Sequence, residues 1–299
     1  DISLSFEFLK KILKFQTITY QYSFMRQTNP IMSSVSDYML IFSFYFKKIF
    51  VNKYSNPKKL IYSGYLYSSY IKILKKKVNY FKKKFNLKNK FVITYFDENF
   101  SKSMWSLSSK KEMIKEYETL SNFVLDNKDI VIIIKTQFYK NLPRFFHKNE
   151  TIKKAMKTKR LVELVDDYLN IYLKNKVSLY MKRNNILPMM GSLISDISIS
   201  KKYGATTSIE TAILNKRNIM INEKGFKEPL DKYYKRNIEF KNIKKALKRI
   251  LIYKKNMRQN KKDNLGDWSF LINKIIKIKH YDNHRFVNNI RKILKKTYD

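Results

Sequence analysis

Short, continuous apolar runs alternate with amphipathic stretches along most of the chain. The runs FVITYF (91–96) and NIMIN (218–222) are rich in β-branched and aromatic residues and have the length of buried strands. Residues 69–85 and 109–125 carry apolar side chains at helical spacing, with lysine and other polar residues between them. Continuous strands that alternate with such helices are typical of a parallel sheet covered on both faces. The pattern therefore predicts a doubly wound α/β domain over about residues 67–240.

Strand-like and helix-like segments also occur on both sides of that domain. Towards the N-terminus, residues 15–22, 37–42 and 60–66 are short and rich in apolar residues, and each predicts a strand. Towards the C-terminus, the chain from Ile243 is mostly helical and basic in pattern, with a polar break at 259–268. We therefore expect a second α/β segment before the central domain and a helical tail after it.

The central domain contains further predicted elements besides the two strands and two helices already named. Ser108 or Ser109 has the side chain to cap the helix that follows it. The remaining elements are strands over 129–138, 177–181 and 197–200, helices over 151–173 and 207–215, and a helix or turn over 185–194.

Polar residues at the carboxyl ends of the strands are the candidates for function. Ligands of doubly wound proteins bind outside those ends. Lys135 closes a buried strand, and an acidic turn follows another. The candidates for ligand binding or catalysis are Asp97, Glu98, Lys135, Gln137, Tyr203, Gly204, Ala205, Thr206, Thr207, Ser208 and Glu210.

The hydroxyl-rich turn from Tyr203 to Ser208 has two explanations, which are compatible. Thr207 and Glu210 have the spacing of a capping box, in which each side chain takes up a free backbone N–H at the start of a helix. The start of a helix after a strand also attracts phosphate, and Gly204 allows a ligand to approach the backbone closely. A carboxylate at Glu210 could then accept hydrogen bonds from a ribose or sugar hydroxyl. The residues alone leave both explanations open.

The charge of the chain suggests anionic partners but has a simpler explanation. Sixty-three lysine and arginine residues against 24 acidic residues give a net charge of +39. Lysine, asparagine, isoleucine, phenylalanine and tyrosine are all abundant, whereas arginine and alanine are scarce; AT-rich codons produce this joint bias. Nucleic-acid-binding proteins favour arginine for contacts with bases and phosphates. We therefore do not expect a nucleic acid partner, although a basic nucleic-acid-binding protein remains an alternative.

Composition and motifs exclude several other classes. The chain has no cysteine and only three scattered histidines, so no metal site is expected. No apolar run approaches the length of a membrane span. The sequence lacks GxxxxGK[ST], GxGxxG and GxSxG, which argues against Walker-type NTPases, standard dinucleotide-binding folds and α/β-hydrolases.

The segment SDISIS…GATTSIETAILNKRNIMIN (195–222) resembles the donor-binding segment of GT-B glycosyltransferases of bacterial surface-polysaccharide biosynthesis. In that family a strand leads to a turn of small residues, a helix that begins S/T-x-x-E-A, and the next strand. Glu210 stands where the family often has a nucleotide-contacting glutamate, and IIIKTQF with Lys135 resembles another strand end of the same half. Thr136 and Arg217 depart from the pattern, because the family usually has proline at both positions.

The resemblance implies a fold and a division of the chain. The fold is α/β, with a doubly wound, Rossmann-like domain of the GT-B type. The division gives the remainder of an acceptor-side domain, which looks truncated, over 1–66, a nucleotide-sugar-binding domain over 67–256 and a basic helical tail over 257–299.

The implied activity is the transfer of a sugar from a nucleotide-sugar donor to a surface polysaccharide or glycolipid. The donor is a substrate, and neither a metal nor another cofactor is expected. The catalytic base is not assigned, because Asp97 and Glu98 qualify by position only and a solvated turn is their alternative role. A sugar-nucleotide epimerase of the same fold is the alternative activity. The expected location is the cytoplasm, with attachment to the inner face of an anionic cytoplasmic membrane through lysine-rich faces such as 72–90 as an option.

Overall fold

The computed structural model describes most of the chain, and everything below concerns the described residues. These are 9, 12–13, 15–21, 36–51, 57–97, 109–136, 148–165, 186–202, 206–278, 287–288 and 290–292. The chain divides into two compact units, one formed by Asp1–Lys72 with Ser269–Asp299 and the other by Ile73–Trp268.

The first unit contains a parallel three-stranded sheet in the order β1-β2-β3. Its strands are β1 (Ile18–Tyr20), β2 (Tyr38–Ile41) and β3 (Lys59–Tyr62). They confirm the strands predicted for the N-terminal part of the chain. The short helices of this unit are η2 (Phe44–Phe46), α2 (Lys47–Phe50), η3 (Leu66–Tyr70) and the π-helix η5 (Leu271–Ile276).

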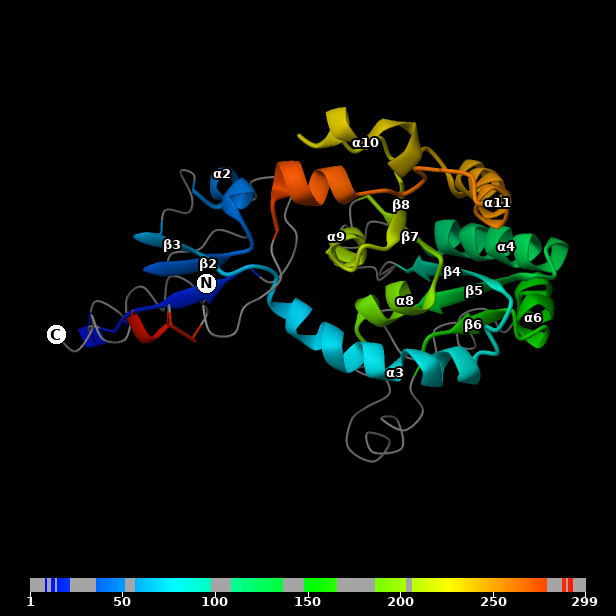
Figure 1. The fold of residues 1–299 in the computed structure, drawn as a ribbon, viewed down its shortest axis with the longest axis horizontal. Helices are drawn as coiled ribbons and strands as arrows, with labels where there is room; N and C mark the ends of the chain where they lie inside the picture. The colour runs from blue at the N-terminus through cyan, green and yellow to red at the C-terminus, as the bar shows by residue number, and fades with distance from the viewer. Residues whose placement is uncertain are drawn as a thin grey trace. The chain divides into compact units, whose positions relative to one another are not determined.

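The second unit contains a six-stranded sheet in the order β6-β5-β4-β7-β8-β9, in which every neighbouring pair is parallel (Figure 1). Numbered from its first strand, this is the Rossmann order 3-2-1-4-5-6, so the predicted doubly wound α/β fold is confirmed. The strands are β4 (Phe91–Phe96), β5 (Ile130–Lys135), β6 (Leu161–Glu163), β7 (Ile197–Lys201), β8 (Arg217–Ile221) and β9 (Glu239–Phe240).

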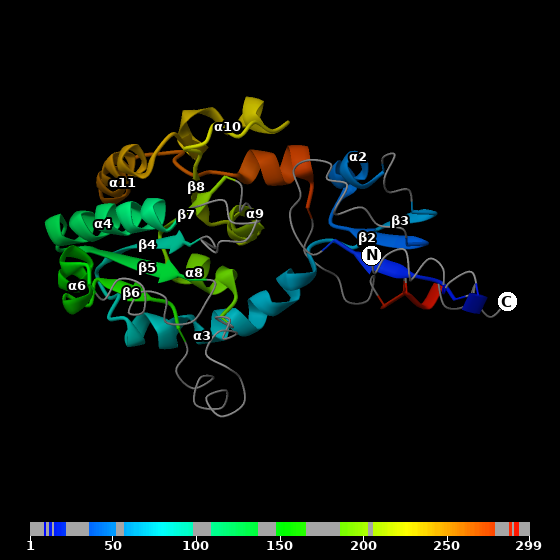
Figure 2. The ribbon, with the colours of Figure 1, turned by 180° about the vertical axis from the view of Figure 1, so that it is seen from behind.

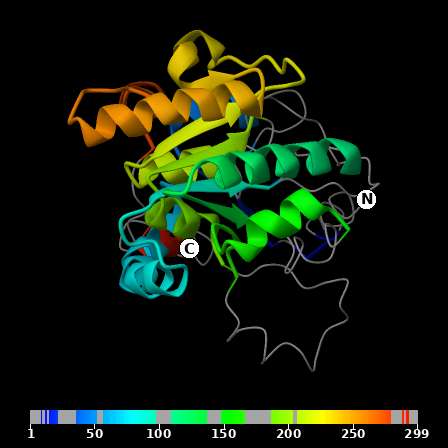
Figure 3. The same ribbon diagram turned by 90° about the vertical axis from the view of Figure 1, so that its right-hand side faces the viewer.

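Helices cover both faces of this sheet, and every residue of β4, β5 and β7 is buried. Successive residues of a strand point to opposite faces. Ile93 and Tyr95 join a core with α4 (Lys110–Asp126), α6 (Glu150–Lys157) and α11 (Ile243–Arg258), whereas Val92 joins one with α3 (Ile71–Lys84) and α8 (Pro188–Ile194). Figure 2 shows the two layers from behind, and in Figure 3 α4 and α6 lie in front of the strands. The remaining helices are α9 (Thr206–Ile213) and α10 (Asp231–Ile238).

Local signals in the sequence account for several helix boundaries. Ser109 caps α4, and Glu112 completes a capping box with it, which confirms one of the two predicted caps. The predicted helix over 151–173 is wrong from Thr158 to Val165, and its remainder lies outside the described residues. Lys159 adopts a left-handed backbone with φ of 57°, and the chain then enters β6. The strand predicted over 177–181 lies outside the described residues.

The C-terminal part of the chain divides differently from the predicted tail at 257–299. Residues up to Trp268 pack with the second unit, because the Trp268 indole is buried and donates to the Asn218 carbonyl at 2.8 Å. Residues from Ser269 belong to the first unit, where Ser43 Oγ donates to the Ile276 carbonyl at 2.5 Å. Among the described residues, no helix is both long enough and apolar enough to cross a bilayer.

Candidate functional site

The strand order of the six-stranded sheet reverses between β4 and β7, and such a switch point is where doubly wound proteins bind ligands. Asp97 follows β4, and α9 begins at Thr206, a few residues after the end of β7. Lys135 ends β5, beside β4, and its carbonyl accepts a hydrogen bond from the Asp97 backbone N–H at 3.1 Å. Three predicted site segments therefore meet at one edge of the sheet.

Lys135 is a buried cation with hydrogen-bonding capacity to spare. Its side chain is 7% exposed, and Nζ donates to the Thr136 carbonyl at 2.7 Å. Within the described part of the chain the ammonium has no other hydrogen bond or ion pair, so two of its three N–H groups lack a protein partner. Burial lowers the pKa of Lys135 to about 8, against the opposing effect of the nearby carboxylates Asp97, Glu163 and Glu210. A buried ammonium in this state suits an anionic ligand.

Glu210 is the second predicted residue that the structure brings to this edge. It lies one turn into α9 and is 7% exposed, and its charge acts on the Lys135 ammonium. Ser208, in the first turn of the same helix, is fully buried.

The capping box predicted for Thr207 and Glu210 is wrong. The helix begins at Thr206, so Thr207 lies inside its first turn and is not the capping residue. Thr207 Oγ1 is buried and has no hydrogen-bond partner among the described residues, whereas a capping box would bond it to the Glu210 backbone N–H. The first backbone N–H groups of α9 are thus not taken up by this side chain.

Asp97 is held in place by protein contacts, contrary to the solvated turn that was its alternative. It is half-buried, and one carboxylate oxygen, Oδ2, accepts a hydrogen bond from the Tyr117 hydroxyl of α4 at 2.8 Å. Burial, with the nearby Asp97 charge as the next cause, raises the pKa of Tyr117 well above its usual value. The Tyr117 hydroxyl therefore remains a donor to this carboxylate. The candidates outside the described residues are Glu98, Gln137, Tyr203, Gly204 and Ala205, and their assignment stays a prediction.

The end of β7 carries a buried ion pair that the sequence pattern did not predict. Lys201 is 2% exposed and pairs with Glu116 of α4, which also accepts a hydrogen bond from the Tyr95 hydroxyl of β4. Glu223, after β8, lies 3.9 Å from the same ammonium. The pair joins the last residue of β7 to α4 and thereby fixes the strand end that precedes the turn.

Lys202, the residue after β7, forms a second set of ion pairs with different elements. Lys202 is 2% exposed and contacts Asp231 of α10 at 2.5 Å and Glu239 of β9 at 2.7 Å. Its ammonium also lies 5.4 Å from the centre of the Tyr234 ring. Because successive strand residues point in opposite directions, two consecutive lysines anchor the chain to different elements just before the turn.

A signal for these lysines exists in the sequence, but it is weak. The run ISIS is followed directly by Lys201 and Lys202, so the buried strand has no polar spacer before its lysines. In the part of the chain that the structure describes, no group of three or more histidine, cysteine or acidic residues could hold a metal ion.

Comparisons with known proteins bear on the fold. No family model matches the sequence, and no curated protein matches it significantly. Among solved structures, the wall teichoic acid polymerase TagF has a TM-score of 0.50 at 14% identity, covering 87% of this chain and 57% of its own. HepE from Anabaena with UDP has a TM-score of 0.49 at 10% identity, covering 97% and 74%. A putative UDP-N-acetylglucosamine 2-epimerase from Listeria monocytogenes has 0.46 at 13%, covering 82% and 59%.

The likeness to TagF confirms the GT-B type of fold that the donor segment implied. At 14% identity this likeness concerns the fold. The chain spans 57% of the length of the TagF structure. What the site binds must therefore be argued from its own residues.

Proposed function

We propose that the carboxyl edge of the six-stranded sheet binds a nucleotide-sugar donor, and that the protein transfers its sugar to a surface polysaccharide or glycolipid. One observation carries the proposal. At the switch point of a GT-B-type sheet, the buried Lys135 ammonium retains two N–H groups that no described residue accepts, near Glu210 and the start of α9.

Each of these groups has a chemical role in holding the donor. The backbone N–H groups and the positive dipole end at Thr206 to Ser208 would bind the diphosphate, and the Lys135 ammonium would neutralise part of its charge. The Glu210 carboxylate would accept hydrogen bonds from a ribose or sugar hydroxyl. Lys201 and Lys202 would act indirectly, because their ion pairs fix the end of β7 from which the donor turn departs.

The proposed reaction is a displacement at the anomeric carbon. An acceptor hydroxyl oxygen bonds to that carbon, the bond from the carbon to the phosphate oxygen breaks, and the acceptor proton passes to a base. The nucleoside diphosphate leaves with an added negative charge, which the start of α9 and Lys135 would stabilise. Asp97 remains a candidate base by position, and the Tyr117 hydroxyl would hold its carboxylate in one orientation.

We further propose that the protein works at an anionic membrane surface. Within the second unit, the outer side of α3 exposes Ile73 and Tyr80 among its lysines. Apolar and aromatic side chains between basic ones are typical of helices that lie at a membrane surface. The test is co-sedimentation with vesicles. Binding to phosphatidylglycerol vesicles that is lost on Ile73→Ser and Tyr80→Ser supports the proposal, and equal binding by wild type and variant contradicts it.

The donor site is tested by titrating uridine, guanosine and cytidine nucleotide sugars into the intact protein and into Lys135→Gln and Glu210→Gln. Loss of one charge-assisted hydrogen bond weakens binding by about tenfold or more, so each variant should show at least that loss for the preferred nucleotide. Lys244→Gln removes an exposed lysine of α11 and serves as the charge control. If Lys244→Gln weakens binding as much as Lys135→Gln, the assignment of the site fails.

Product analysis separates the proposed activity from its alternatives. Turnover of the nucleotide sugar only with a glycan acceptor supports a transferase. Conversion without any acceptor identifies an epimerase instead. Tight and steeply salt-dependent binding to RNA or DNA, with no nucleotide-sugar binding, would favour the nucleic-acid-binding alternative.

A further inference from the structure

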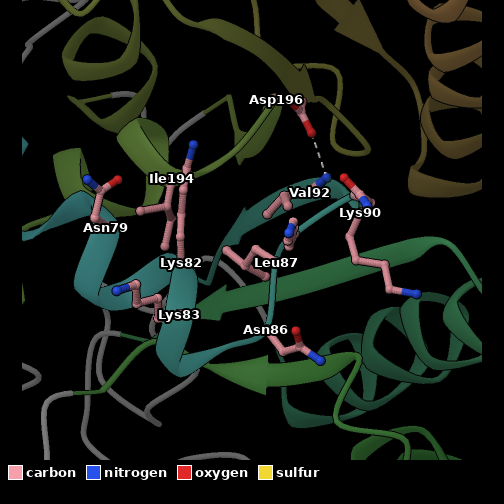
Figure 4. A pocket seen from close by; sticks show the side chains of 11 residues that line it. Asn79, Lys82, Lys83, Asn86, Leu87, Lys90, Val92, Ile194 and Asp196 are labelled. Atoms are coloured by element: carbon pink, nitrogen blue, oxygen red, sulfur yellow. Dashed lines mark hydrogen bonds between the residues drawn. The ribbon is translucent and has the colours of Figure 1, made fainter.

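A cavity lies at the amino end of the six-stranded sheet, opposite the proposed donor site. It has a volume of about 610 Å³ and lies between the last turns of α3, the loop that follows them and the residues before β7. Figure 4 shows Val92 at the start of β4 and Asp196 just before β7, joined by a hydrogen bond of 2.7 Å. The cavity has the size of a small-molecule site. The reaction proposed above does not use it.

Lysines line this cavity, and several form no hydrogen bond or ion pair with the described residues. Lys90 Nζ donates to the Lys128 carbonyl at 3.1 Å, and in Figure 4 its side chain points away from Lys82. By contrast, Lys82, Lys83 and Lys88 are exposed, and no hydrogen bond or ion pair joins their ammonium groups to the part of the chain that the structure describes. Asp196 is the one carboxylate among the lining residues, so the cavity carries an excess of positive charge.

The excess charge also acts on partly buried groups. Lys216 Nζ donates to the Ser195 carbonyl at 3.3 Å, next to Asp196. Burial lowers the pKa of Lys216, Asp196 opposes this effect, and the neighbouring Lys82 lowers that pKa further. Lys82 and Lys216 thus repel each other. Asp196 offsets part of this repulsion, and its carboxylate already accepts a hydrogen bond from the Val92 backbone N–H. A bound anion would reduce this repulsion, because it would compensate the second cation.

The fold explains some lining residues without any ligand. Asn86 has a left-handed backbone with φ of 51° and ends α3, where the Leu87 N–H donates to the Lys82 carbonyl at 2.9 Å. Asn89 also has a left-handed backbone. Lysine in the last turn of a helix complements the helix dipole, which accounts for part of the charge. These explanations do not extend to Asn79, which faces the cavity from inside α3, or to Lys88 in the loop.

We propose that this cavity is a second binding site, for a phosphate ester that carries a hydroxylated body, such as a sugar phosphate. Lys82, Lys83 and Lys88 would bind the phosphate, because no described residue forms a hydrogen bond or ion pair with their ammonium groups. The amides of Asn79 and Asn86 both donate and accept hydrogen bonds, as hydroxyl groups require. The phosphate could belong to a soluble ester or to a phospholipid headgroup. The site is independent of the proposed donor site at the other end of the sheet.

The test is calorimetric titration of the full chain with glucose 6-phosphate, glucose and inorganic phosphate at physiological ionic strength. The ester should bind more tightly than inorganic phosphate, and glucose should not bind. Lys82→Gln/Lys88→Gln should weaken ester binding by about tenfold or more, whereas Lys244→Gln/Lys248→Gln, which removes two exposed lysines of α11, should change it by less than about twofold. Lys135→Gln should not change it, which separates this site from the donor site.

A charge-neutral variant tests the cavity itself. Asn79→Trp places a large side chain on the exposed side of α3 that lines the cavity, and it should abolish ester binding while thermal unfolding stays unchanged. A second experiment compares binding to vesicles of phosphatidic acid with binding to vesicles of phosphatidylcholine. If the protein binds phosphatidic acid vesicles but not the soluble ester, and Asn79→Trp abolishes the vesicle binding, the phosphate belongs to a lipid headgroup. Absence of binding to any probe, or equal losses in the cavity and α11 variants, overturns the proposal.

Discussion

Lysines occupy both ends of the six-stranded sheet, in very different states. At the carboxyl end, Lys135, Lys201 and Lys202 are all buried, and the last two pair with carboxylates of α4, α10 and β9. At the amino end, Lys82 and Lys88 are exposed and have no partner among the described residues. The first group fixes the chain around a site, and the second leaves positive charge available to whatever enters the cavity.

The difference matters because the chain carries a net charge of +39. With so many lysines, an exposed one says little by itself about function. Burial is the better criterion. A buried ammonium loses its hydration, so it persists only where carboxylates, hydrogen bonds or a ligand compensate that loss.

The largest effect is expected at Lys201. Lys201→Met leaves the Glu116 carboxylate buried beside Tyr95 without its cation, and removal of one partner of a buried pair costs about 3–5 kcal/mol. Chemical denaturation should show this loss of unfolding free energy. The double variant Lys201→Met/Glu116→Leu should recover most of it. A loss below about 1 kcal/mol in the single variant would mean that Lys201 behaves like a surface lysine.

A smaller effect is expected at Lys202. Its carboxylate partners Asp231 and Glu239 are both partly exposed, so water can solvate them once the ammonium is gone. Lys202→Met should therefore cost about 1–3 kcal/mol of unfolding free energy, measured by the same denaturation. A cost equal to that of Lys201→Met would show that exposure of the partner carboxylate does not govern these pairs.

Nucleotide binding should depend on pH through Lys135. Because the pKa of its ammonium is about 8, the cation loses its proton as the pH rises through that value, and affinity for a diphosphate should fall by up to about tenfold between pH 7 and 9. The bound diphosphate raises this pKa in the complex, so the affinity starts to fall near pH 8 and continues to fall until the pKa of the complex is reached. Titrations should show a flat profile over this range for Lys135→Gln. The same slope in both proteins would assign the pH dependence to another group.

The stability of the protein should show the complementary trend. The pKa of Lys135 lies below its ordinary value of 10.5, so between about pH 8 and 10.5 the unfolded chain binds more protons at this position than the folded chain. The contribution of Lys135 therefore becomes more stabilising as the pH rises through this window. Below about pH 8 the buried Lys135 ammonium stays charged in the folded protein, and its burial lowers the unfolding free energy. The difference in unfolding free energy between wild type and Lys135→Gln, measured across the window, isolates this contribution.

The smallest effect is expected for the lysines of the amino end. Lys82→Gln/Lys88→Gln should change the unfolding free energy by less than about 0.5 kcal/mol, because no described contact is lost. A small gain is also consistent, since the substitution removes the repulsion between Lys82 and Lys216. Thermal and chemical unfolding check this together. A large loss would show that these lysines, like those of the carboxyl end, support the fold.

The sequence was sufficient for the fold where one local pattern decided the outcome. The strands β4 and β5 are almost entirely apolar, and β8 ends in three apolar residues; parallel pairing between helices is a general solution for such runs. The short strand β6 was missed, because Leu161 to Glu163 also continue a helical pattern and only the left-handed turn at Lys159 breaks it.

The site was predictable in part, and its failures have physical causes. The end of a buried strand located Lys135, and the helix start located Glu210. The predicted capping residue, Thr207, was wrong because three consecutive hydroxyl residues, Thr206 to Ser208, offer alternative starts for one helix. Lys201 could not be singled out because its partner Glu116 is 85 positions away, and a local pattern contains no such pairing.

The central claim is that the carboxyl end of this sheet, and not its more exposed basic surface, binds the nucleotide-sugar donor. The most direct measurement compares the affinity of one nucleotide sugar, chosen from the panel above, for wild type, Lys135→Gln and Lys82→Gln/Lys88→Gln at physiological ionic strength. The account predicts a loss of about tenfold or more in Lys135→Gln and no change in the double variant. A loss in the double variant with unchanged binding by Lys135→Gln would contradict it.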